Sequence, residues 1–482
     1  TALWIAEAQM YEETRALVTI DANFLPLRSN SNMMEGNALQ MDWNTVCQKK
    51  KLTYIVGNPP FVGASKMDKK QKNEVVAILG KVERVKSVDY VGGWFHKAAE
   101  FINGTKIRCA LVATNSITQG EQVAPLWQDL LNKYHIHIDF AFKTFKWESE
   151  SKDAAAVHVV IIGFSQSLTS QIKKIFDNEN KQEVSNITPY LTDTPFTVLV
   201  KASGKAISKV PKMTKGNQPS DGGNLILSEE EKTELIKKDL SISDLIYEYV
   251  GSEDFINHKK PRYCLWLKDV SPSRYSNNKN IIERLLAVKE FRSKSTAAPT
   301  RELAIKPYRF FSTPQTRECC LAVPEVSSGR RSYIPMGFMT PKSFFSNQVN
   351  LIPHATLYHF GVLTSKVHMI WVRAICGRLK SDYRYSKDIV YNNFPWCNAT
   401  EKQRAKIEKT AQAILDVRAK YSTSSLSDLY DELTMPFDLR KAHKANDKAV
   451  LEAYGLSDKM SENEIVTQLF KLYAVLSTKA SL

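Results

Sequence analysis

The chain has 482 residues, of which 43% are hydrophobic and 24% are charged. Single hydrophobic cores stop growing at roughly 250 to 300 residues, so this length predicts two or three domains. No apolar run approaches the roughly 20 residues that a membrane helix needs, so we expect no membrane span. The seven cysteines form no C-x-x-C pair, which favours a reducing, cytoplasmic compartment and predicts no metal site.

The formal net charge of the chain is +15 at pH 7. Such a charge attracts polyanions, and the release of counterions adds a salt-dependent affinity for DNA or RNA. Many basic proteins of this size bind no nucleic acid, so motifs have to decide between these classes. We expect the protein to be a monomer.

The opening segment, TALWIAEAQMYEETR, carries acidic residues where a secretory signal peptide has a basic end and an apolar stretch. We therefore expect the chain to be an internal part of a longer protein. A doubly wound nucleotide-binding sheet usually opens with a strand, a glycine-rich turn and a helix. No such turn follows Thr1.

The first 165 residues alternate short apolar runs with helical patterns, which predicts an α/β fold with a truncated Rossmann-like sheet. Continuous apolar runs are typical of strands covered on both faces, whereas an alternating run is typical of a half-exposed strand. The expected covered strands are residues 54–56, 109–115 and 157–164, the expected half-exposed strand is residues 135–142, and the expected crossover helices are residues 91–102 and 122–134.

The rest of the chain changes character twice. A polar stretch over residues 165–223 predicts a connection between domains. Short strand-like runs and many basic and aromatic residues follow, which predicts a mixed α+β domain. After it, Thr400 and Gln403 have the spacing of a capping box and precede an amphipathic helical stripe. The stripe consists of Ile407, Ala411, Ile414 and Leu415. We therefore expect domains at residues 1–180, 181–397 and 398–482, the last of them helical.

The tetrapeptide Asn58-Pro59-Pro60-Phe61 is the most informative motif, because it directly follows an expected buried strand. Ligand sites of α/β sheets lie at such strand ends. The exocyclic amine of adenine is a poor nucleophile, since its lone pair is delocalised into the ring. The Asn58 side-chain carbonyl and the backbone carbonyl of Pro59 could accept its hydrogens, and Phe61 offers a flat face for an extruded base. Taken alone, the same tetrapeptide also fits a stiff turn.

The neighbouring sequence resembles the MmeI-like family of gamma-class DNA adenine-N6 methyltransferases, which belong to restriction-modification systems. GNPPFVGASKM (57–67) resembles motif IV of that family. Further stretches with family-like order and spacing are EGNALQMDW (35–43), VDYVGGWFHKAAEF (88–101), ALVATNSITQGEQV (110–123), FKWESESKDAAAVHVVIIGF (145–164), RYCLWL (262–267), SSGRRSYIPMGF (327–338) and GRLKSDYRYSKDIVYNNFPW (377–396). The resemblance covers about four fifths of the chain.

This resemblance implies roles for individual residues. The target adenine would be held by the tetrapeptide 58–61, and Trp147 or Phe145 would stack against the flipped base. Asn37, with Ala38 beside it, would face the adenine of S-adenosylmethionine. Asp89 would border the same cofactor. Each of these residues also has a plain structural interpretation, as a turn, core or helix-start residue.

Two parts of the family pattern are absent from the sequence. We find neither the glycine-rich motif that wraps the methionine part of S-adenosylmethionine nor the nuclease domain with its metal-binding cluster. We therefore expect an incomplete cofactor site in this chain.

Two basic clusters are expected to contact double-stranded DNA. Arginine can bridge two acceptors on a guanine edge, whereas lysine more often meets phosphate as a point charge. The first cluster consists of Arg330, Arg331 and Tyr333, and the second consists of Arg378, Lys380 and Arg384. Some of these charges could equally belong to solvated faces.

The sequence thus favours methyl transfer to the N6 amine of an adenine in specific duplex DNA. One alternative is an inactive fragment that only recognises its DNA sequence. Another is a different acceptor at the same motif, such as an RNA base or a glutamine amide of a protein.

Overall fold

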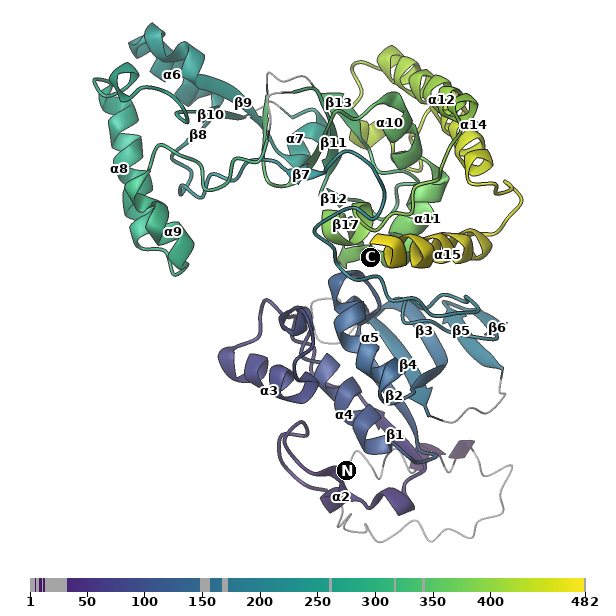
Figure 1. The fold of residues 1–482 in the computed structure, drawn as a ribbon. Coiled ribbons are helices and arrows are strands. Elements are labelled where there is room, and N and C mark those ends of the chain that lie inside the picture. The colour runs from purple at the N-terminus through teal and green to yellow at the C-terminus, as the bar shows by residue number, and fades with distance from the viewer. Residues whose placement is uncertain are drawn as a thin grey trace.

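The computed structural model describes residues 5, 8–10, 12–13, 33–147, 157–166, 172–259, 262–315, 318–339 and 343–480. Figure 1 shows an N-terminal α/β domain, a lobe that projects from the middle of the chain, and a central region flanked by C-terminal helices. None of the described helices is both long and apolar enough to cross a lipid bilayer. The predicted succession of an α/β sheet, an α+β domain and a helical region is confirmed.

The N-terminal domain is built on a sheet of six strands in the order β1-β2-β4-β3-β5-β6. The strands are β1 (Tyr54–Gly57), β2 (Arg108–Thr114), β3 (His137–Trp147), β4 (Val157–Ser165), β5 (Lys173–Asp177) and β6 (Asn180–Val184). β1 runs parallel to β2, while β4 runs antiparallel to both of its neighbours, β2 and β3. The carboxyl ends of β1, β2 and β3 therefore lie at one edge of the sheet, which we call the carboxyl edge.

Three expectations about this sheet need correction. The strand expected to be covered at residues 54–56 is exposed, with Tyr54 64% and Val56 79% exposed, because β1 lies at the end of the described strand order. The expected half-exposed strand at 135–142 continues to Trp147, and its burial does not alternate, because β3 shifts register against β4 after Ile138 and after Phe142. The polar stretch after residue 165 is not only a connection, since β5 and β6 extend the sheet within it. Hydrophilic hairpins of this kind carry little periodic signal.

Helices cover the sheet as the sequence predicts. α4 (Gly92–Ile102) and α5 (Val123–Asn132) lie within the two expected helical ranges, and their apolar faces are buried. Phe95 of α4 stacks on Phe164 of β4, with 5.6 Å between ring centroids. α2 (Trp43–Val46) and α3 (Lys69–Leu79) lie before and after β1 in the chain. Asp68 and Gln71 form a capping box at the start of α3.

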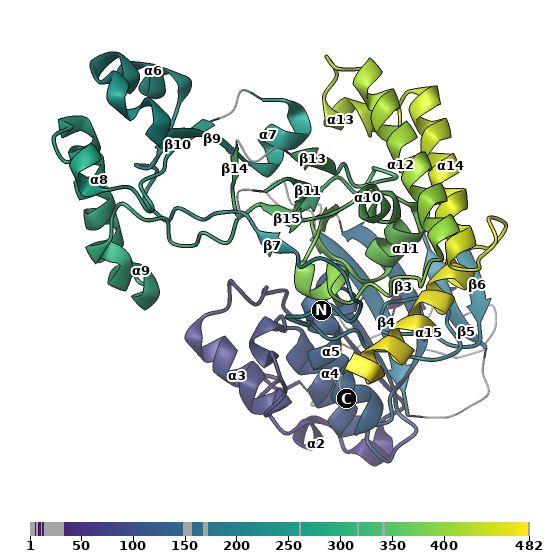
Figure 2. The same cartoon turned by 45° about the horizontal axis from the view of Figure 1, so that its top comes forward.

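The projecting lobe, residues 224–312, has a hydrophobic core of its own around Trp266 and Phe310. Its elements are β8 (Ile226–Leu227), α6 (Glu229–Lys238), β9 (Ile246–Val250), α7 (Ser252–Asn257), β10 (Arg262–Leu265), α8 (Lys279–Ser293) and α9 (Ala298–Glu302). Figures 1 and 2 show α6, α8 and α9 at the far end of the molecule from the C-terminal helices, whereas α7 lies beside the central strands and contacts α13 (Leu426–Leu429). β14 (Phe344–Phe345) joins β9 at the edge of the lobe's sheet.

The central region contains two small sheets and two helices. One sheet has the order β13-β11-β15-β7 and the other has the order β12-β17-β16. The elements are β7 (Thr214–Lys215), β11 (Cys320–Pro324), β12 (Val326–Ser327), β13 (Gly337–Met339), β15 (Val349–Pro353), α10 (Leu357–Leu363), α11 (Lys366–Ile375), β16 (Gly377–Leu379) and β17 (Asp382–Arg384).

The C-terminal helices begin where the capping-box spacing predicts. Thr400 caps α12 (Glu401–Lys420) by accepting a hydrogen bond from the backbone of Gln403, and Ile407, Ala411 and Ile414 are buried. α13 (Leu426–Leu429), α14 (Phe437–Ala453) and α15 (Glu462–Ala480) follow. The hydrophobic residues of the N-terminal, central and C-terminal regions form one continuous cluster, whereas the projecting lobe is packed separately.

Candidate active site

The Asn58–Phe61 segment leaves the sheet at the carboxyl edge, immediately after β1. Pro59 is buried and Phe61 is half-buried, whereas Asn58 and Pro60 are exposed. The Asn58 side chain makes no hydrogen bond to any other residue that the structure describes. The Asn58 amide is therefore exposed, and the buried Pro59 next to it anchors the segment. A residue that holds a nucleobase needs such an accessible amide.

Asp89 holds the segment that follows Phe61 by accepting hydrogen bonds from it and from the end of β2. Its Oδ1 accepts a hydrogen bond from the backbone N–H of Ala64 at 2.7 Å, three residues beyond Phe61. Its Oδ2 accepts from Ser116 Oγ at 2.5 Å and from Thr114 Oγ1 at 3.4 Å, at the end of β2. Asp89 is 6% exposed. The carboxylate thus ties the motif loop to the neighbouring strand end, and the cofactor-binding role expected for it stays a prediction.

The segment with Asn37 and Ala38 is held by internal contacts. Asn37 Nδ2 donates to Glu74 Oε1 at 3.0 Å, and its Oδ1 accepts from the backbone N–H of Leu39 at 2.9 Å. The Ala38 carbonyl accepts from Trp43 Nε1 at 2.8 Å. Asn37 therefore serves here as a turn residue that fixes its own segment.

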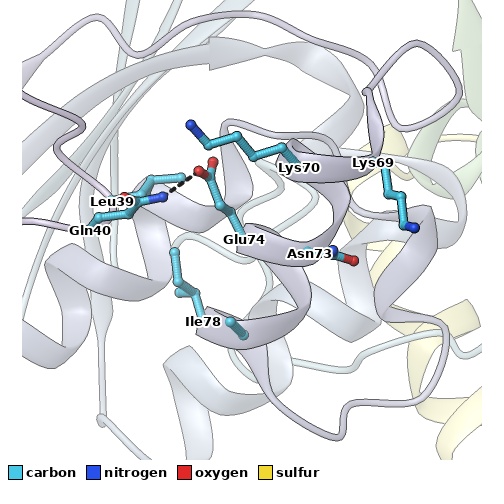
Figure 3. A pocket seen from close by; sticks show the side chains of 8 residues that line it. Leu39, Gln40, Lys69, Lys70, Asn73, Glu74 and Ile78 are labelled. Carbon is cyan, nitrogen blue, oxygen red and sulfur yellow. Dashed lines mark hydrogen bonds between the residues drawn. The ribbon is translucent and has the colours of Figure 1, made fainter.

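The carboxylate of Glu74 on α3 accepts hydrogen bonds from several side chains around Asn37. It also accepts hydrogen bonds from Gln40 Nε2 at 2.6 Å and from the Tyr90 hydroxyl. Burial and the neighbouring Glu74 carboxylate raise the pKa of Tyr90 to about 12, so its hydroxyl stays protonated and donates. Figure 3 shows Gln40 and Glu74 linked at the wall of a cavity of about 630 Å³. Leu39, Gln40, Lys69, Lys70, Asn73, Glu74, Ala77 and Ile78 line this cavity.

Phe145 and Trp147 lie at the same carboxyl edge as Asn58, because β3 and β1 point the same way. Their rings are 6.2 Å apart, and Trp147 is 41% exposed. β2 and β4 separate β1 from β3, which corresponds to roughly 14 Å between strand axes. Residues 148–156, which follow Trp147, lie outside the described residues.

The two predicted basic clusters come together in the sheet β12-β17-β16. β16 and β17 form a hairpin, which we call the basic hairpin (residues 377–384), and β12 pairs with its second strand. The backbone N–H of Gly329 donates to Asp382 Oδ1 at 3.3 Å, which joins the first cluster to this hairpin. Segments that lie about 50 residues apart in sequence thus form one surface.

The basic residues of this surface differ in exposure and in the ion pairs that they make. Arg330 is highly exposed. Its Nη2 lies 3.7 Å from Asp431 Oδ2, which is a loose ion pair. Lys380 is exposed at the turn of the basic hairpin and forms no ion pair with the residues that the structure describes. The guanidinium of Arg378 lies 3.8 Å from the centroid of the Tyr383 ring, and Arg384 pairs loosely with Glu325 at 3.7 Å.

Two predicted DNA contacts lie deeper in the protein than expected. Tyr333 is buried, its ring stacks on His443 at 4.1 Å, and its hydroxyl donates to Asp447 Oδ2 at 2.6 Å. Tyr333 is therefore a packing residue between the central region and α14, and its expected DNA contact is withdrawn. Arg331 is half-buried and donates to Ser427 Oγ at 3.0 Å, so it links the same regions.

A polar cavity of about 560 Å³ lies between the basic hairpin, the carboxyl edge and α15. Arg378, Lys380 and Ser381 line it from the hairpin, and Asn115, Thr118, Gln119, Lys143 and His158 line it from the N-terminal domain. Sequence reasoning missed this second group. The polar run directly after the 109–115 strand was the available signal, because ligands of α/β sheets bind beyond such strand ends.

Comparison with known proteins identifies this architecture. Three consecutive family models match the chain: "MmeI, DNA-methyltransferase domain" over residues 1–177, "MmeI, target recognition domain" over residues 195–398, and "MmeI, C-terminal domain" over residues 399–480. The chain belongs to the MmeI-like family of DNA methyltransferases. The N-terminal domain is thus its methyltransferase domain, and the projecting lobe with the central region forms its recognition domain.

Two members of this family are closely similar to the chain. DNA methyltransferase A of Bacillus subtilis (strain 168) is 40% identical over 481 residues. A solved structure of the type IIL restriction-modification enzyme MmeI in complex with DNA matches with a TM-score of 0.91 and 41% identity. Each alignment covers 99% of this chain, but only 54% of the Bacillus protein and 64% of the MmeI chain. The chain therefore spans little more than half the length of these relatives.

Family membership implies S-adenosylmethionine as the methyl donor. The side chains of Asn37 and Asp89 and the carbonyl of Ala38 make hydrogen bonds within the chain. The cofactor contacts expected of these three residues stay predictions.

Proposed function

We propose that the protein methylates the N6 amine of one adenine within a specific sequence of double-stranded DNA, as part of a restriction-modification system. The observation that carries this proposal is the open Asn58 amide at the carboxyl edge, on a segment anchored by Pro59 and Asp89. S-adenosylmethionine is the proposed methyl donor.

Asn58 and Pro59 would act on the adenine by accepting its two amine hydrogens. The Asn58 side-chain carbonyl and the Pro59 backbone carbonyl would draw the nitrogen lone pair out of conjugation with the ring and aim it at the methyl group. Because the amine loses its proton after transfer, the step needs no strong base. The Asn58 carbonyl has no competing partner among the described residues, so accepting a new hydrogen bond breaks none.

Phe61 and an aromatic residue of β3 would hold the extruded base. A base inside a duplex cannot reach a protein pocket unless it leaves the stack, and it then needs flat faces on which to rest. Phe61 is half-buried beside Asn58, while Trp147 keeps 41% of its surface exposed at the same edge of the sheet. We prefer Trp147 to Phe145 as the second face.

The surface formed by Arg330 and the basic hairpin would bind the duplex. Arg378 and Lys380 of this surface line the same polar cavity as residues of the carboxyl edge, so bound DNA would contact both domains. Arg330, Arg378, Lys380 and Arg384 remain the proposed contacts, with Arg331 as a partly buried member.

The test uses the full-length protein and unmethylated genomic DNA with radiolabelled S-adenosylmethionine, followed by mapping of the modified bases. We expect N6-methyladenine at one sequence. Asn58→Ala should lower the transfer rate at least about hundredfold, the scale of losing one well-placed polar group at a reacting centre. Its DNA affinity and thermal stability should stay unchanged, because the side chain is exposed.

Asn58→Asp is the matched control. It keeps an acceptor oxygen in the same place, so it should retain more activity than Asn58→Ala. Methylation of RNA or of a protein amide, but never of DNA, would reject the proposal. DNA binding with no transfer by the full-length protein would favour the inactive recognition module instead.

A further inference from the structure

At one point of the contact between the methyltransferase and recognition domains, two glycines meet. Gly120 begins the 3₁₀ turn η4 (Gly120–Gln122), and Gly377 begins β16 of the basic hairpin. A Cβ on Gly120 would lie 3.1 Å from the Cα of Gly377 and 3.4 Å from its backbone nitrogen. Two backbones therefore meet directly, with no side chain between them.

Gly120 is constrained in a second way. Its φ is +66°, a left-handed conformation that side-chain-bearing residues adopt at a cost. Most other left-handed glycines of the chain do not meet a second domain. Gly80 and Gly104, with φ of +70° and +74°, have nothing within 4 Å of an added Cβ. At Gly120 the conformation and the close approach coincide.

The turn that carries Gly120 leads directly to the catalytic segment. Gln122, at the end of the same turn, accepts a hydrogen bond on Oε1 from the backbone N–H of Asp89 at 2.8 Å. Asp89 in turn accepts from Ala64 at 2.7 Å, just beyond Phe61. Two hydrogen bonds thus separate the turn from the loop that presents Asn58.

The other glycine leads directly to the proposed DNA surface. Gly377 is followed by Arg378, and Lys380 stands at the turn of the same short hairpin. Gln119, next to Gly120, lines the same cavity as Arg378 and Lys380. A hairpin of this length moves as a unit, so a displacement of Gly377 displaces both basic side chains.

We propose that the Gly120–Gly377 contact is a positioning contact that fixes the register between the recognised DNA sequence and the base presented to Asn58. It sets how far the basic hairpin stands from the carboxyl edge, so that recognition and methylation act on bases a fixed distance apart. This inference rests on the proposed function. Widening the contact shifts the target base away from Asn58 while leaving the phosphate and base contacts of the recognition domain in place.

Gly120→Ala is the direct test, with Gly104→Ala as its matched control. Both substitutions put an L side chain at a similar left-handed φ in the same domain, but only the first pushes against a second backbone. The substrate is a duplex carrying the sequence mapped with the wild-type protein. One version has 2-aminopurine at the target adenine, because its fluorescence rises when the base leaves the stack.

We expect Gly120→Ala to lower the single-turnover methylation rate by about threefold to tenfold, because the contact must open by a few tenths of an ångström and a misplacement of about 1 Å costs about hundredfold. The 2-aminopurine signal should fall with it, while the Kd for DNA should stay within about twofold of wild type. Gly104→Ala should match the wild-type protein in rate, signal and Kd, although its thermal stability should fall like that of Gly120→Ala.

A second pair of variants approaches the contact from the other side. A Cβ on Gly377 would lie 3.7 Å from the Gly120 Cα, an ordinary contact distance, and the backbone there is not left-handed. Gly377→Val adds two further methyl groups at a strand position that favours valine. The methylation rate of Gly377→Ala should therefore stay near that of wild type, whereas that of Gly377→Val should fall, even if Gly120→Ala fails to fold.

Two results would overturn the inference. One is a wild-type rate and 2-aminopurine signal in Gly377→Val. The other is equal loss of activity in Gly120→Ala and Gly104→Ala, which would assign the effect to folding. Failure of the proposed function looks different, because the wild-type protein itself would then transfer no methyl group to DNA.

Discussion

At the scale of single residues, Asp89 and Asn58 differ in burial and in hydrogen bonding. Asn58 is exposed and free to accept a hydrogen bond, whereas Asp89 is buried and already accepts hydrogen bonds from Ala64, Thr114 and Ser116. A buried acceptor with several partners fixes backbone position, because removing it leaves each donor unpaired. The position of the loop that carries Asn58 thus depends on a buried residue.

Substitutions of Asp89 should show how far the stability of the fold and the rate of methylation depend on its hydrogen bonds. Asp89→Ala leaves the Ala64 N–H and the Ser116 hydroxyl without their acceptor, so unfolding free energy should drop by about 1–3 kcal/mol and methylation should slow. Asp89→Asn keeps one acceptor oxygen for Ala64 and an amide that can donate to Ser116. Urea unfolding and transfer assays on both variants check this, and equal stability of Asp89→Ala and wild type would contradict it.

At the scale of elements, hydrogen bonds to the buried Asp447 of α14 connect the central region to this helix. Tyr333 donates to Asp447, and the backbone N–H of Lys366 donates to the same carboxylate at 2.6 Å. Burial raises the pKa of Asp447 to about 6, although the Tyr333 and Lys366 hydrogen bonds and the Lys366 and Arg373 charges oppose the rise. The folded protein therefore holds this proton more tightly than the unfolded chain, whose Asp pKa is about 3.9.

The sign of the pH effect follows from that difference. Stability from Asp447 is fully present below about pH 4 and is lost as the pH rises through about 6, with a span of at most about 3 kcal/mol. The difference in unfolding free energy between wild type and Asp447→Asn should shrink over this range. Urea unfolding at several pH values measures it, and a pH-independent difference would show that Asp447 does not titrate there. Tyr333→Phe removes an opposing hydrogen bond and should move the window upwards.

At the scale of the whole molecule, the net charge is +15, and Arg378 and Lys380 line the same cavity as residues of the carboxyl edge. Each phosphate neutralised by the protein contributes about −0.9 to the slope of log affinity against log salt concentration. Arg330 and Lys380 are exposed and have little internal pairing, so their charges are available to phosphates.

The double variant Arg330→Ala, Lys380→Ala should therefore reduce the magnitude of that slope by about two. Fluorescence anisotropy with a fixed duplex at several salt concentrations measures it. Lys406→Ala is the control, since this lysine lies on α12 and pairs with Glu452. An unchanged slope in the double variant would place the DNA elsewhere on the protein.

The sequence by itself determined much of the local structure. Apolar runs and a capping box were enough to predict β2, β4, α4, α5 and the start of α12, because burial and helix capping act over a few residues. The place of the Asn58–Phe61 segment after a strand followed from the apolar run before it. The bulged course of β3 and the hairpin of β5 and β6 carried no comparable periodic signal.

Only the tertiary structure decided which distant residues meet. It joined Arg330 to the basic hairpin, buried Tyr333 against His443, turned Asp89 into a support of the motif loop and brought Gly120 against Gly377. Each of these contacts links residues that are well separated in the chain. Side-chain identity states what a residue can bond, whereas strand register and domain packing determine which partner lies within a few ångströms of it.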